Sequence, residues 1–347
     1  MARGKVIIGV DLGGTNINVG MLTADNRVDP KSQVNKKTQA AQGVDIVISR
    51  IADAIKESCE QAGITTRQVA AVGIGAAGAI DPVRGVVRKG PNLGFTNVPL
   101  AAAIQKRIGA RTFLENDVNA AAYGEWKMGA AKGVTDFMAV WIGTGVGGGI
   151  VLNNKMYSGG FLTAGEIGHM MMVPGAPMGR RSVEDTCSRT AISERLLALM
   201  ATGHPSMLKE IIEKEKKELL KKTEDDLKRK GKASWQFESN KILRSRAIAE
   251  AYKAGDDLTR AVVHEAAEYL GMAIGGVVTL LSLPHVVIGG GFTEALGEPW
   301  VRAVREEVRK YAFPAECKKV EVKGTALKDT AGIVGAGLLA RDGMGKR

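Results

Sequence analysis

Apolar and polar residues alternate along the first part of the chain, and this pattern predicts two strands joined by a tight turn. Residues 6–10 are rich in β-branched side chains, glycines then interrupt the run, and the alternation resumes over residues 16–22. The spacing of apolar residues further along predicts a helix, a strand, a second helix and a second strand, over residues 43–62, 68–74, 100–108 and 111–115.

The second half of the chain repeats this plan. A helix is predicted over residues 119–128, and two strands at 137–142 and 149–152 are joined by another glycine-rich turn. Two copies of strand, glycine turn and strand, one opening each half, indicate an internal duplication. The remaining predicted elements are helices over 258–270, 300–311 and 331–340 and a strand over 285–288.

The length predicts more than one domain, because 347 residues are too many for one compact core. We expect a small N-terminal α/β domain over residues 1–116, joined by the C-terminal helix at 327–347. A large α/β domain is expected over 117–326. It carries a charged insert near 205–245, interpreted as a long solvated helix or helical pair, with partner binding as the alternative.

The net charge of +11 indicates either affinity for polyanions or simply a basic solvated surface, and we favour the second interpretation. Aromatic residues form only 5% of the chain, and no basic run is interleaved with them, so stacking on nucleic-acid bases is not expected. We therefore expect no nucleic-acid partner.

The cysteines and the N-terminus predict a cytoplasmic protein. Cys59, Cys187 and Cys317 lie far apart, which favours free thiols in a reducing compartment over disulfides or a cysteine-built metal site. The chain enters a strand almost at once, without a signal peptide. Residues 269–293 carry no charged side chain, but Pro284 and several glycines favour a buried helix and strand over a membrane span.

The first glycine-rich turn, residues 13–15, is a candidate phosphate site. Gly13 and Gly14 lack side chains, so their backbone N–H groups can approach an anion, and Thr15 adds another donor. Asp11, at the end of the strand, can hold a hydrated Mg²⁺. The alternative is an ordinary hairpin with a Gly-Gly turn.

Two segments satisfy the dinucleotide pattern G-x-G-x-x-G, at residues 73–78 and 143–148. A dinucleotide site needs that turn to open a helix within a βαβ unit, and neither segment does so. The second turn, residues 143–145 with Thr144 and Gly145, fits a second phosphate-binding hairpin better.

Three further segments have the chemistry of a binding site. Asp117 lies where an apolar strand meets a helix, as a catalytic acid or base often does, but taken alone it is better explained as the N-cap of that helix. Glu166 and His169 suit hydrogen bonding to a polyol, or are a surface acid and a structural histidine. The glycine run Gly289, Gly290 and Gly291 follows a buried strand and is open to an adenine or a phosphate.

Taken together, these motifs resemble the ROK (repressor, open reading frame, kinase) family of sugar kinases, most closely its glucokinases. The motifs that carry the resemblance occur in order as Asp11-Leu-Gly-Gly-Thr15, Asn92-Leu-Gly-Phe95, Glu115-Asn-Asp117, Gly143-Thr-Gly145, Gly165-Glu-Ile-Gly-His169, Val287-Ile-Gly-Gly-Gly291 and Ala331-Gly-Ile-Val-Gly-Ala336. They extend over nearly the whole chain outside the charged insert.

The resemblance implies an actin-like, ribonuclease-H-like α/β ATPase fold of two domains, with ATP, Mg²⁺ and a hexose bound in the cleft between them. It implies that Asp117 is the general base on the 6-hydroxyl of the sugar, and that the two turns surround the phosphates. The residues that it assigns to sugar binding are Gly78, Asn92, Asn116, Asp117, Glu166, His169 and Glu184. A homodimer or higher homo-oligomer is expected.

The resemblance leaves the substrate and donor open. We expect glucose and ATP first. The alternatives are a kinase of another hexose (an N-acetylated hexosamine, mannose or fructose) and a glucokinase that uses polyphosphate. A sugar-sensing regulator without catalysis is a further alternative, although Asp117 and the two turns are present and no DNA-binding segment is found.

The chain departs from the family at two places. The cysteines of the family's zinc motif are replaced by Gly175, Pro177 and Ser182, none of which provides a thiolate, so no zinc is expected. The family's proline before Gly78 is replaced by Ala77, which changes the expected shape of the sugar pocket.

Overall fold

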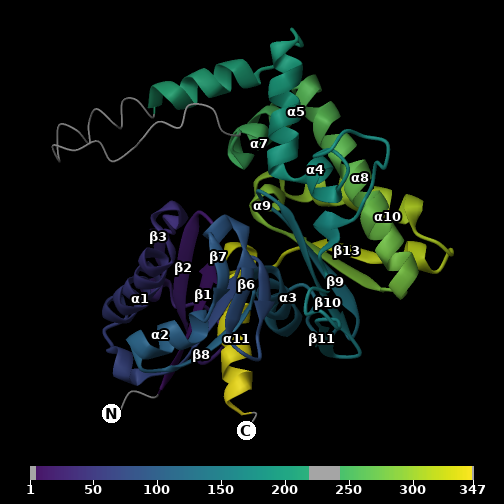
Figure 1. Cartoon of the computed structure of the whole chain (residues 1–347). Helices are drawn as coiled ribbons and strands as arrows, with labels where there is room; N and C mark the ends of the chain where they lie inside the picture. The colour runs from purple at the N-terminus through teal and green to yellow at the C-terminus, as the bar shows by residue number, and fades with distance from the viewer. Residues whose placement is uncertain (1–4, 219–242, 346–347) are drawn as a thin grey trace.

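A computed structural model describes residues 5–218 and 243–345, and its core is built on two five-stranded sheets (Figure 1). The first sheet has the strand order β3-β2-β1-β4-β8. Strands β1 and β2 form the predicted hairpin, and β4 and β8 run parallel to β1. The strand bounds are β1 (Val6–Leu12), β2 (Asn16–Leu22), β3 (Val34–Lys37), β4 (Val69–Ala76) and β8 (Arg111–Asn116).

The second sheet repeats the plan of the first, with the order β11-β10-β9-β12-β13. Its first three strands are again antiparallel neighbours, and β12 and β13 continue the sheet in parallel with β9. The predicted internal duplication is therefore confirmed. The bounds are β9 (Phe137–Ile142), β10 (Val146–Leu152), β11 (Lys155–Tyr157), β12 (His285–Gly289) and β13 (Glu321–Gly324).

A third, small sheet extends the first half and was not predicted as a separate unit. It has the order β5-β6-β7, with β5 (Ala79–Asp81), β6 (Val86–Gly90) and β7 (Phe95–Val98). The strands are antiparallel, and β5 follows β4 after a turn at residues 77–78. The segment at 73–78 thus runs from strand to strand, as expected for a turn that is not a dinucleotide site.

The helices of the first half match the predicted periodicity. Helix α1 (Val44–Gln61) buries Ile48, Ile51 and Ile55 on one face, and α2 (Leu100–Ile108) has the predicted bounds. Short 3-10 helices η1 (Pro30–Ser32), η2 (Ala40–Gln42), η3 (Thr66–Gln68) and η4 (Pro91–Leu93) connect the strands of this half.

The second half carries most of the helices, gathered on the upper part of the molecule in Figure 1. Helix α8 runs to Leu281, well past the predicted end at residue 270, because its apolar face stays buried against α10. The elements are η5 (Ile167–His169), α4 (Val183–Cys187), α5 (Arg189–Ala201), α7 (Ser245–Ala254), α8 (Asp257–Leu281), α9 (Gly291–Leu296), α10 (Glu298–Tyr311), η6 (Cys317–Lys319) and η7 (Lys328–Thr330).

The charged insert is described only in part. Residues 208–218 are helical, as predicted, and residues 219–242 lie outside the described part of the chain. Among the helices of the described ranges, none combines the length and the apolar run required to cross a membrane.

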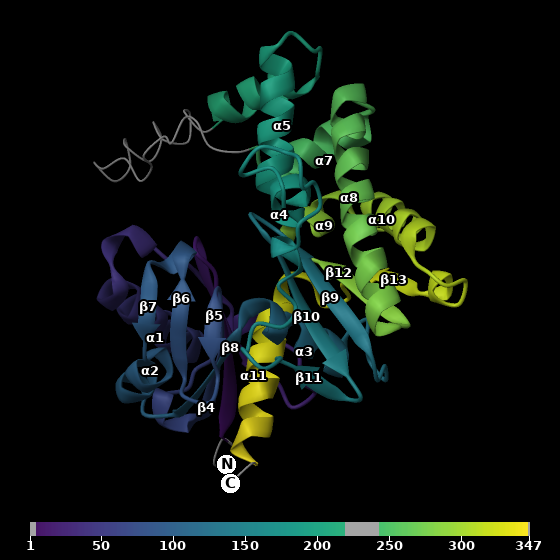
Figure 2. The ribbon, with the colours of Figure 1, turned by 45° about the vertical axis from the view of Figure 1, so that its right-hand side comes forward.

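Helices α3 (Asp117–Met128) and α11 (Ala331–Met344) lie between the two large sheets (Figure 2). The hydrophobic cluster there joins Ala122 of α3 and Ile333 of α11 to Leu22 of the first sheet and Val287 of the second. Helix α11 thus returns from the end of the chain to pack on the N-terminal sheet. We propose that it completes the small domain of residues 1–116, apart from the large domain of residues 117–326.

Glycines allow α11 to lie unusually close to its neighbours. A Cβ atom on Gly9 of β1 would lie 1.9 Å from the carbonyl oxygen of Ile333, and one on Gly73 of β4 would lie 1.8 Å from that of Ala336. On the other side, a Cβ on Gly335 would lie 1.6 Å from the carbonyl oxygen of Ala120 in α3. The helix backbone therefore touches strand and helix backbones directly.

A buried carboxylate fastens α3 to the segment that leads into α11. Glu125 is fully buried, and its carboxylate accepts hydrogen bonds from the backbone N–H groups of Ala130, Ala326 and Leu327 at 2.6, 3.2 and 2.9 Å, and from the hydroxyl of Thr325. These donors satisfy the charge without solvent. The two chain segments that cross between the sheets are thus held at one point.

We predict that Gly335→Ala destabilises the protein by about 1–3 kcal/mol, because the added methyl group has to push α11 away from α3. Thermal unfolding measures the effect. Gly276→Ala is the matched control, since Gly276 is also helical, is exposed and has no atom within 4 Å of its Cβ position. Alanine is the better helix former, so this control is expected to be neutral or stabilising. Equal melting temperatures for Gly335→Ala and the wild type would contradict the close contact.

Candidate functional site

The strand register of the first sheet brings three acids to one edge. Asp11 of β1 and Glu115 of β8 both pair with Gly75 of β4, which lies between them. Asp117 follows β8 as the first residue of α3, and a Cβ on Gly75 would lie 3.3 Å from its Cα. The carboxyl ends of these parallel strands thus place Asp11 and Asp117 in one site, as edges of α/β sheets commonly do.

Asn116, rather than Asp117, is the N-cap of α3, so the capping alternative for Asp117 is wrong. The Oδ1 atom of Asn116 accepts hydrogen bonds from the N–H groups of Val118 and Asn119 at 2.9 and 3.0 Å. Asp117 Oδ1 also accepts from Val118, at 3.0 Å, and its second carboxylate oxygen has no partner among the described residues. That oxygen is available to a ligand.

The environment raises the pKa of Asp117 to about 7. Burial is the main cause, the charge of Asp11 adds to it, and Glu166 contributes a smaller repulsion. Burial also raises the pKa of Asp11, although the hydrogen bond from Asn18 Nδ2 at 3.1 Å opposes this shift. At neutral pH, Asp117 is therefore poised to accept a proton.

The first turn has two backbone N–H groups without an acceptor among the described residues. The N–H of Gly13 is used within the turn, on the carbonyl of Asn16 at 3.0 Å, whereas those of Gly14 and Thr15 have no acceptor in the described part of the chain. The hydroxyl of Thr38 fixes the turn by donating to the carbonyl of Gly13 at 2.7 Å. The N–H of Gly13 is therefore not free for a phosphate, and Gly13 contributes to the turn only by having no side chain.

The second turn repeats this arrangement. The N–H of Gly143 bonds within the turn, to the carbonyl of Gly145 at 2.9 Å, and those of Thr144 and Gly145 meet no acceptor among residues 5–218 and 243–345. The start of α5 holds the turn, because Arg189 N–H and Thr190 Oγ1 donate to the carbonyls of Gly143 and Thr144 at 2.9 and 2.7 Å. Free N–H pairs of this kind suit an anion.

Glycines of β10 allow this strand, which follows the second turn, to pack closely on the helix that begins at Asp117. A Cβ on Gly147 would lie 2.7 Å from Val118, and one on Gly149 would lie 2.9 Å from the Cβ of Ala122. The first half of α3 therefore packs directly on the strand that leaves the second turn. As a result, both turns and the acids Asp11 and Asp117 belong to one region.

The predicted pair Glu166 and His169 reaches the same region. Gly165 has a φ of +95°, and a Cβ on Gly168 would lie 2.0 Å from the carbonyl oxygen of Val146 in β10. This contact explains the influence of the Glu166 charge on Asp117. His169 Nε2 lies 4.0 Å from Glu166 Oε2, and both side chains are exposed.

Glu184 and Asn116 are already partly engaged by the protein. Glu184 Oε2 accepts from the N–H of Val146 at 2.8 Å, next to the second turn. Asn116 Nδ2 donates to the carbonyl of Gly78 at 3.1 Å. Gly78 has a φ of +120°, and a Cβ there would lie 2.3 Å from the carbonyl oxygen of Lys89, so no other residue fits this turn.

Asn92 lies on the other side of the first turn. It belongs to η4, and a Cβ on Gly14 would lie 2.8 Å from the Cβ of Asn92. The side chain of Asn92 is exposed at this position. The small third sheet thus brings a predicted sugar-binding residue to the first turn.

The glycine run after β12 is explained mainly by packing. A Cβ on Gly289 would lie 2.5 Å from the ring of Trp141, and one on Gly290 would lie 2.5 Å from the carbonyl oxygen of Ile142. Gly291 has no atom within 4 Å of its Cβ position. Packing thus accounts for the lack of side chains at Gly289 and Gly290, and Gly291 has open space on its Cβ side.

Sequence reasoning missed Asn18 and assigned no separate role to Glu115, which lies in the predicted motif at residues 115–117. Asn18 donates to Asp11, and Glu115 Oε1 accepts from the N–H of Asn116 at 2.9 Å and from Asn119 Nδ2 at 3.1 Å. The position of Asn18, on the strand that pairs with Asp11, was the available signal. In the described ranges, no group of three or more acidic, histidine or cysteine side chains forms a ready metal cluster.

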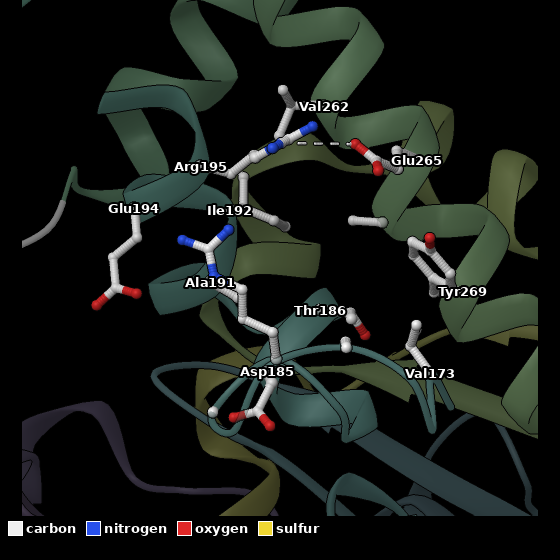
Figure 3. A pocket seen from close by; sticks show the side chains of 14 residues that line it. Val173, Asp185, Thr186, Ala191, Ile192, Glu194, Arg195, Val262, Glu265 and Tyr269 are labelled. Atoms are coloured by element: carbon white, nitrogen blue, oxygen red, sulfur yellow. Dashed lines mark ion pairs between the residues drawn. The ribbon is translucent and has the colours of Figure 1, made fainter. Parts of the chain in front are cut away.

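A separate cavity of about 230 Å³ lies between α4, α5, α8 and the loop at residues 173–180 (Figure 3). Its walls carry charges of both signs, with Arg195 and Glu265 facing each other at 4.0 Å. None of the predicted site residues lines it.

Comparisons with known proteins agree with this geometry. The sequence profile of the ROK family matches residues 7–343. The glucokinase of Thermotoga maritima is 31% identical over 344 residues, which is 98% of both chains. The xylose repressor of Caldicellulosiruptor bescii is 28% identical over 95% of this chain and 76% of its own length.

A crystal structure of a ROK family glucokinase from Streptomyces griseus, in complex with glucose and AMPPNP, is similar throughout. Its TM-score is 0.78 at 29% identity, covering 97% of this chain and 99% of that chain. Together with the duplicated strand order, this similarity confirms the predicted actin-like, ribonuclease-H-like α/β fold.

Proposed function

Because the chain belongs to the ROK family, we propose that this ATP-dependent sugar kinase transfers the γ-phosphoryl group of ATP to the 6-hydroxyl of glucose. The observation that carries the proposal is the raised pKa of Asp117 beside two turns with free backbone donors. Phosphoryl transfer needs positioning and charge stabilisation more than covalent chemistry, and this arrangement offers both.

Asp117 acts as the general base in this proposal. Its unpartnered oxygen takes the proton of the sugar hydroxyl, the hydroxyl oxygen attacks the γ-phosphorus, and the bond to the bridging oxygen of ADP breaks. A carboxyl group with a pKa of about 7 is about half deprotonated at neutral pH, and a catalytic base is most effective when its pKa lies near the working pH. The released proton remains on Asp117 until solvent removes it.

The sugar is held by the polar groups around Asp117. Gly78, Asn92, Asn116, Glu166, His169 and Glu184 are the proposed contacts. Support for this assignment comes from the coupling of Glu166 to Asp117 and from the bond between Asn116 and Gly78. Asn116 keeps one amide hydrogen for a ligand, and Glu184 keeps its Oε1 atom.

The donor phosphates are assigned to Gly13, Gly14, Thr15, Thr144 and Gly145. The nucleotide would extend to the glycine run at residues 289–291, where Gly291 is open. Mg²⁺ fits this site, because Asp11 supplies a carboxylate oxygen, and among the described residues its side chain is bonded only by the amide of Asn18. When bound, the ion would neutralise phosphate charge.

The residues at the family's zinc motif do not fit zinc. Here the loop is held by protein groups instead: Arg181 Nε donates to the carbonyl of Ala176, and Asp185 Oδ2 accepts from the N–H groups of Arg181 and Ser182, both at 3.1 Å. These bonds support a loop that keeps its shape without a metal.

We also propose a cellular compartment and an oligomeric state for the enzyme. The described residues contain three free cysteines, which agrees with a reducing, cytoplasmic compartment. A homodimer or higher homo-oligomer remains our expectation.

The test of the function is a coupled assay of sugars and donors. Glucose with ATP and Mg²⁺ is expected to release ADP faster than mannose, fructose or N-acetylated hexosamines, and polyphosphate is expected to be a poor donor. Faster turnover of another sugar, or faster turnover with polyphosphate than with ATP, would support that alternative instead. Binding of labelled glucose without any sugar-dependent ADP release would instead support a regulator.

Asp117→Asn is expected to lower kcat by at least about 10²-fold while largely preserving glucose binding, because it keeps the shape and removes the base. In the wild type, kcat/KM is expected to fall as the pH drops through about 7, where Asp117 gains its proton. The exposed residue Asp53 provides the control variant Asp53→Asn. Near-normal turnover of Asp117→Asn would exclude it as the base.

We predict that the purified enzyme carries no zinc and keeps full activity after a zinc-selective chelator, once Mg²⁺ is restored. Elemental analysis and the coupled assay measure the two quantities. Stoichiometric zinc together with loss of activity on chelation would show that other ligands have taken over the metal site.

A further inference from the structure

Arg189 is unusual among the basic residues of the protein. Within the described ranges, it is the only half-buried arginine or lysine whose charged group has no hydrogen bond, ion pair or aromatic contact with the protein. Burial lowers its pKa, with no acid opposing the shift. A partly desolvated guanidinium whose donors have no acceptor in the protein is costly, and a ligand that supplies acceptors lowers that cost.

The position of Arg189 indicates what that ligand is. It is the first residue of α5, and its own N–H donates to the carbonyl of Gly143 at 2.9 Å, with Thr190 bonded to Thr144 beside it. Ser188 caps the helix by accepting from the N–H of Ala191 at 3.1 Å. The backbone of Arg189 is therefore fixed against the second turn, within one side-chain length of its free N–H groups.

The charges of the site create a need for a cation here. The proposed site contains the carboxylates of Asp11, Asp117, Glu166 and Glu184, and the donor adds several more negative charges. At the first turn, Lys37 Nζ lies 3.0 Å from Asn16 Oδ1, so a cation stands nearby. At the second turn, Arg189 is the basic residue bonded to the turn itself.

We propose that the guanidinium of Arg189 binds the phosphate chain of the donor at the second turn. This inference rests on the proposed function for the identity of the donor. A planar guanidinium matches two phosphate oxygens at once, and the fixed backbone limits the entropy lost on binding. Arg189 thus adds a positive charge to a turn whose backbone N–H donors are uncharged.

The test compares Arg189→Gln with Arg195→Gln in the complete protein, without glucose present. Arg195 lies on the same helix but is exposed and faces Glu265 across the separate cavity (Figure 3). Calorimetric titration is used with ATP and with adenosine, which has the same base and sugar but no phosphate. Arg189→Gln is expected to weaken ATP binding by about 10- to 100-fold and to change adenosine binding less than about twofold.

Arg195→Gln is expected to leave both affinities within about twofold, and Arg189→Lys to restore part of the ATP affinity. Unchanged ATP binding in Arg189→Gln would overturn the proposal, and so would an equal loss of ATP and adenosine affinity, which indicates a structural role. If the wild type binds ATP through Arg189 but phosphorylates no sugar, the proposed function fails and this inference stands.

Discussion

The close approach of α11 to its neighbours is the constraint on which the rest of the structure depends. Its backbone touches β1 and β4 through Gly9 and Gly73, and it touches α3 at Gly335. A Cβ on Gly332, in the first turn of this helix, would lie 3.0 Å from the carboxyl carbon of Asp11. The strand register places Asp11 and Asp117 at one sheet edge, and a helix formed more than two hundred residues later in the chain packs against Asp11 there.

Around this frame, the site combines negative side chains with uncharged backbone donors. Desolvation raises the pKa values of Asp11 and Asp117, and the charge of Asp11 raises that of Asp117 further. A bound cation or proton relieves this unfavourable electrostatic free energy. The two turns leave equivalent N–H groups unused, as their common origin in a duplicated hairpin predicts. The site is thus prepared for a ligand that brings both phosphate oxygens and positive counterions.

Local patterns in the sequence predicted most elements, because alternation and helical spacing act within a few residues. The helix at 100–108 and the strand at 137–142 have the predicted bounds, and Asp11, Asp117 and Glu166 do lie together. The cap at Asn116, the packing of Gly289 on Trp141 and the bond from Val146 to Glu184 were not predictable. Each depends on segments that are distant in sequence or on one residue's rotamer, which periodicity does not encode. The roles of the individual site residues remain predictions.

The carboxylate of Glu125 has a mechanical consequence. Only α3 and the segment at 325–330 carry the chain between the two sheets in the described part of the protein, and Glu125 bonds to both. Because Glu125 joins both crossings, we expect sliding of one half over the other to cost more than rotation. We therefore expect any relative motion of the two halves to be a rotation about an axis that passes near this carboxylate.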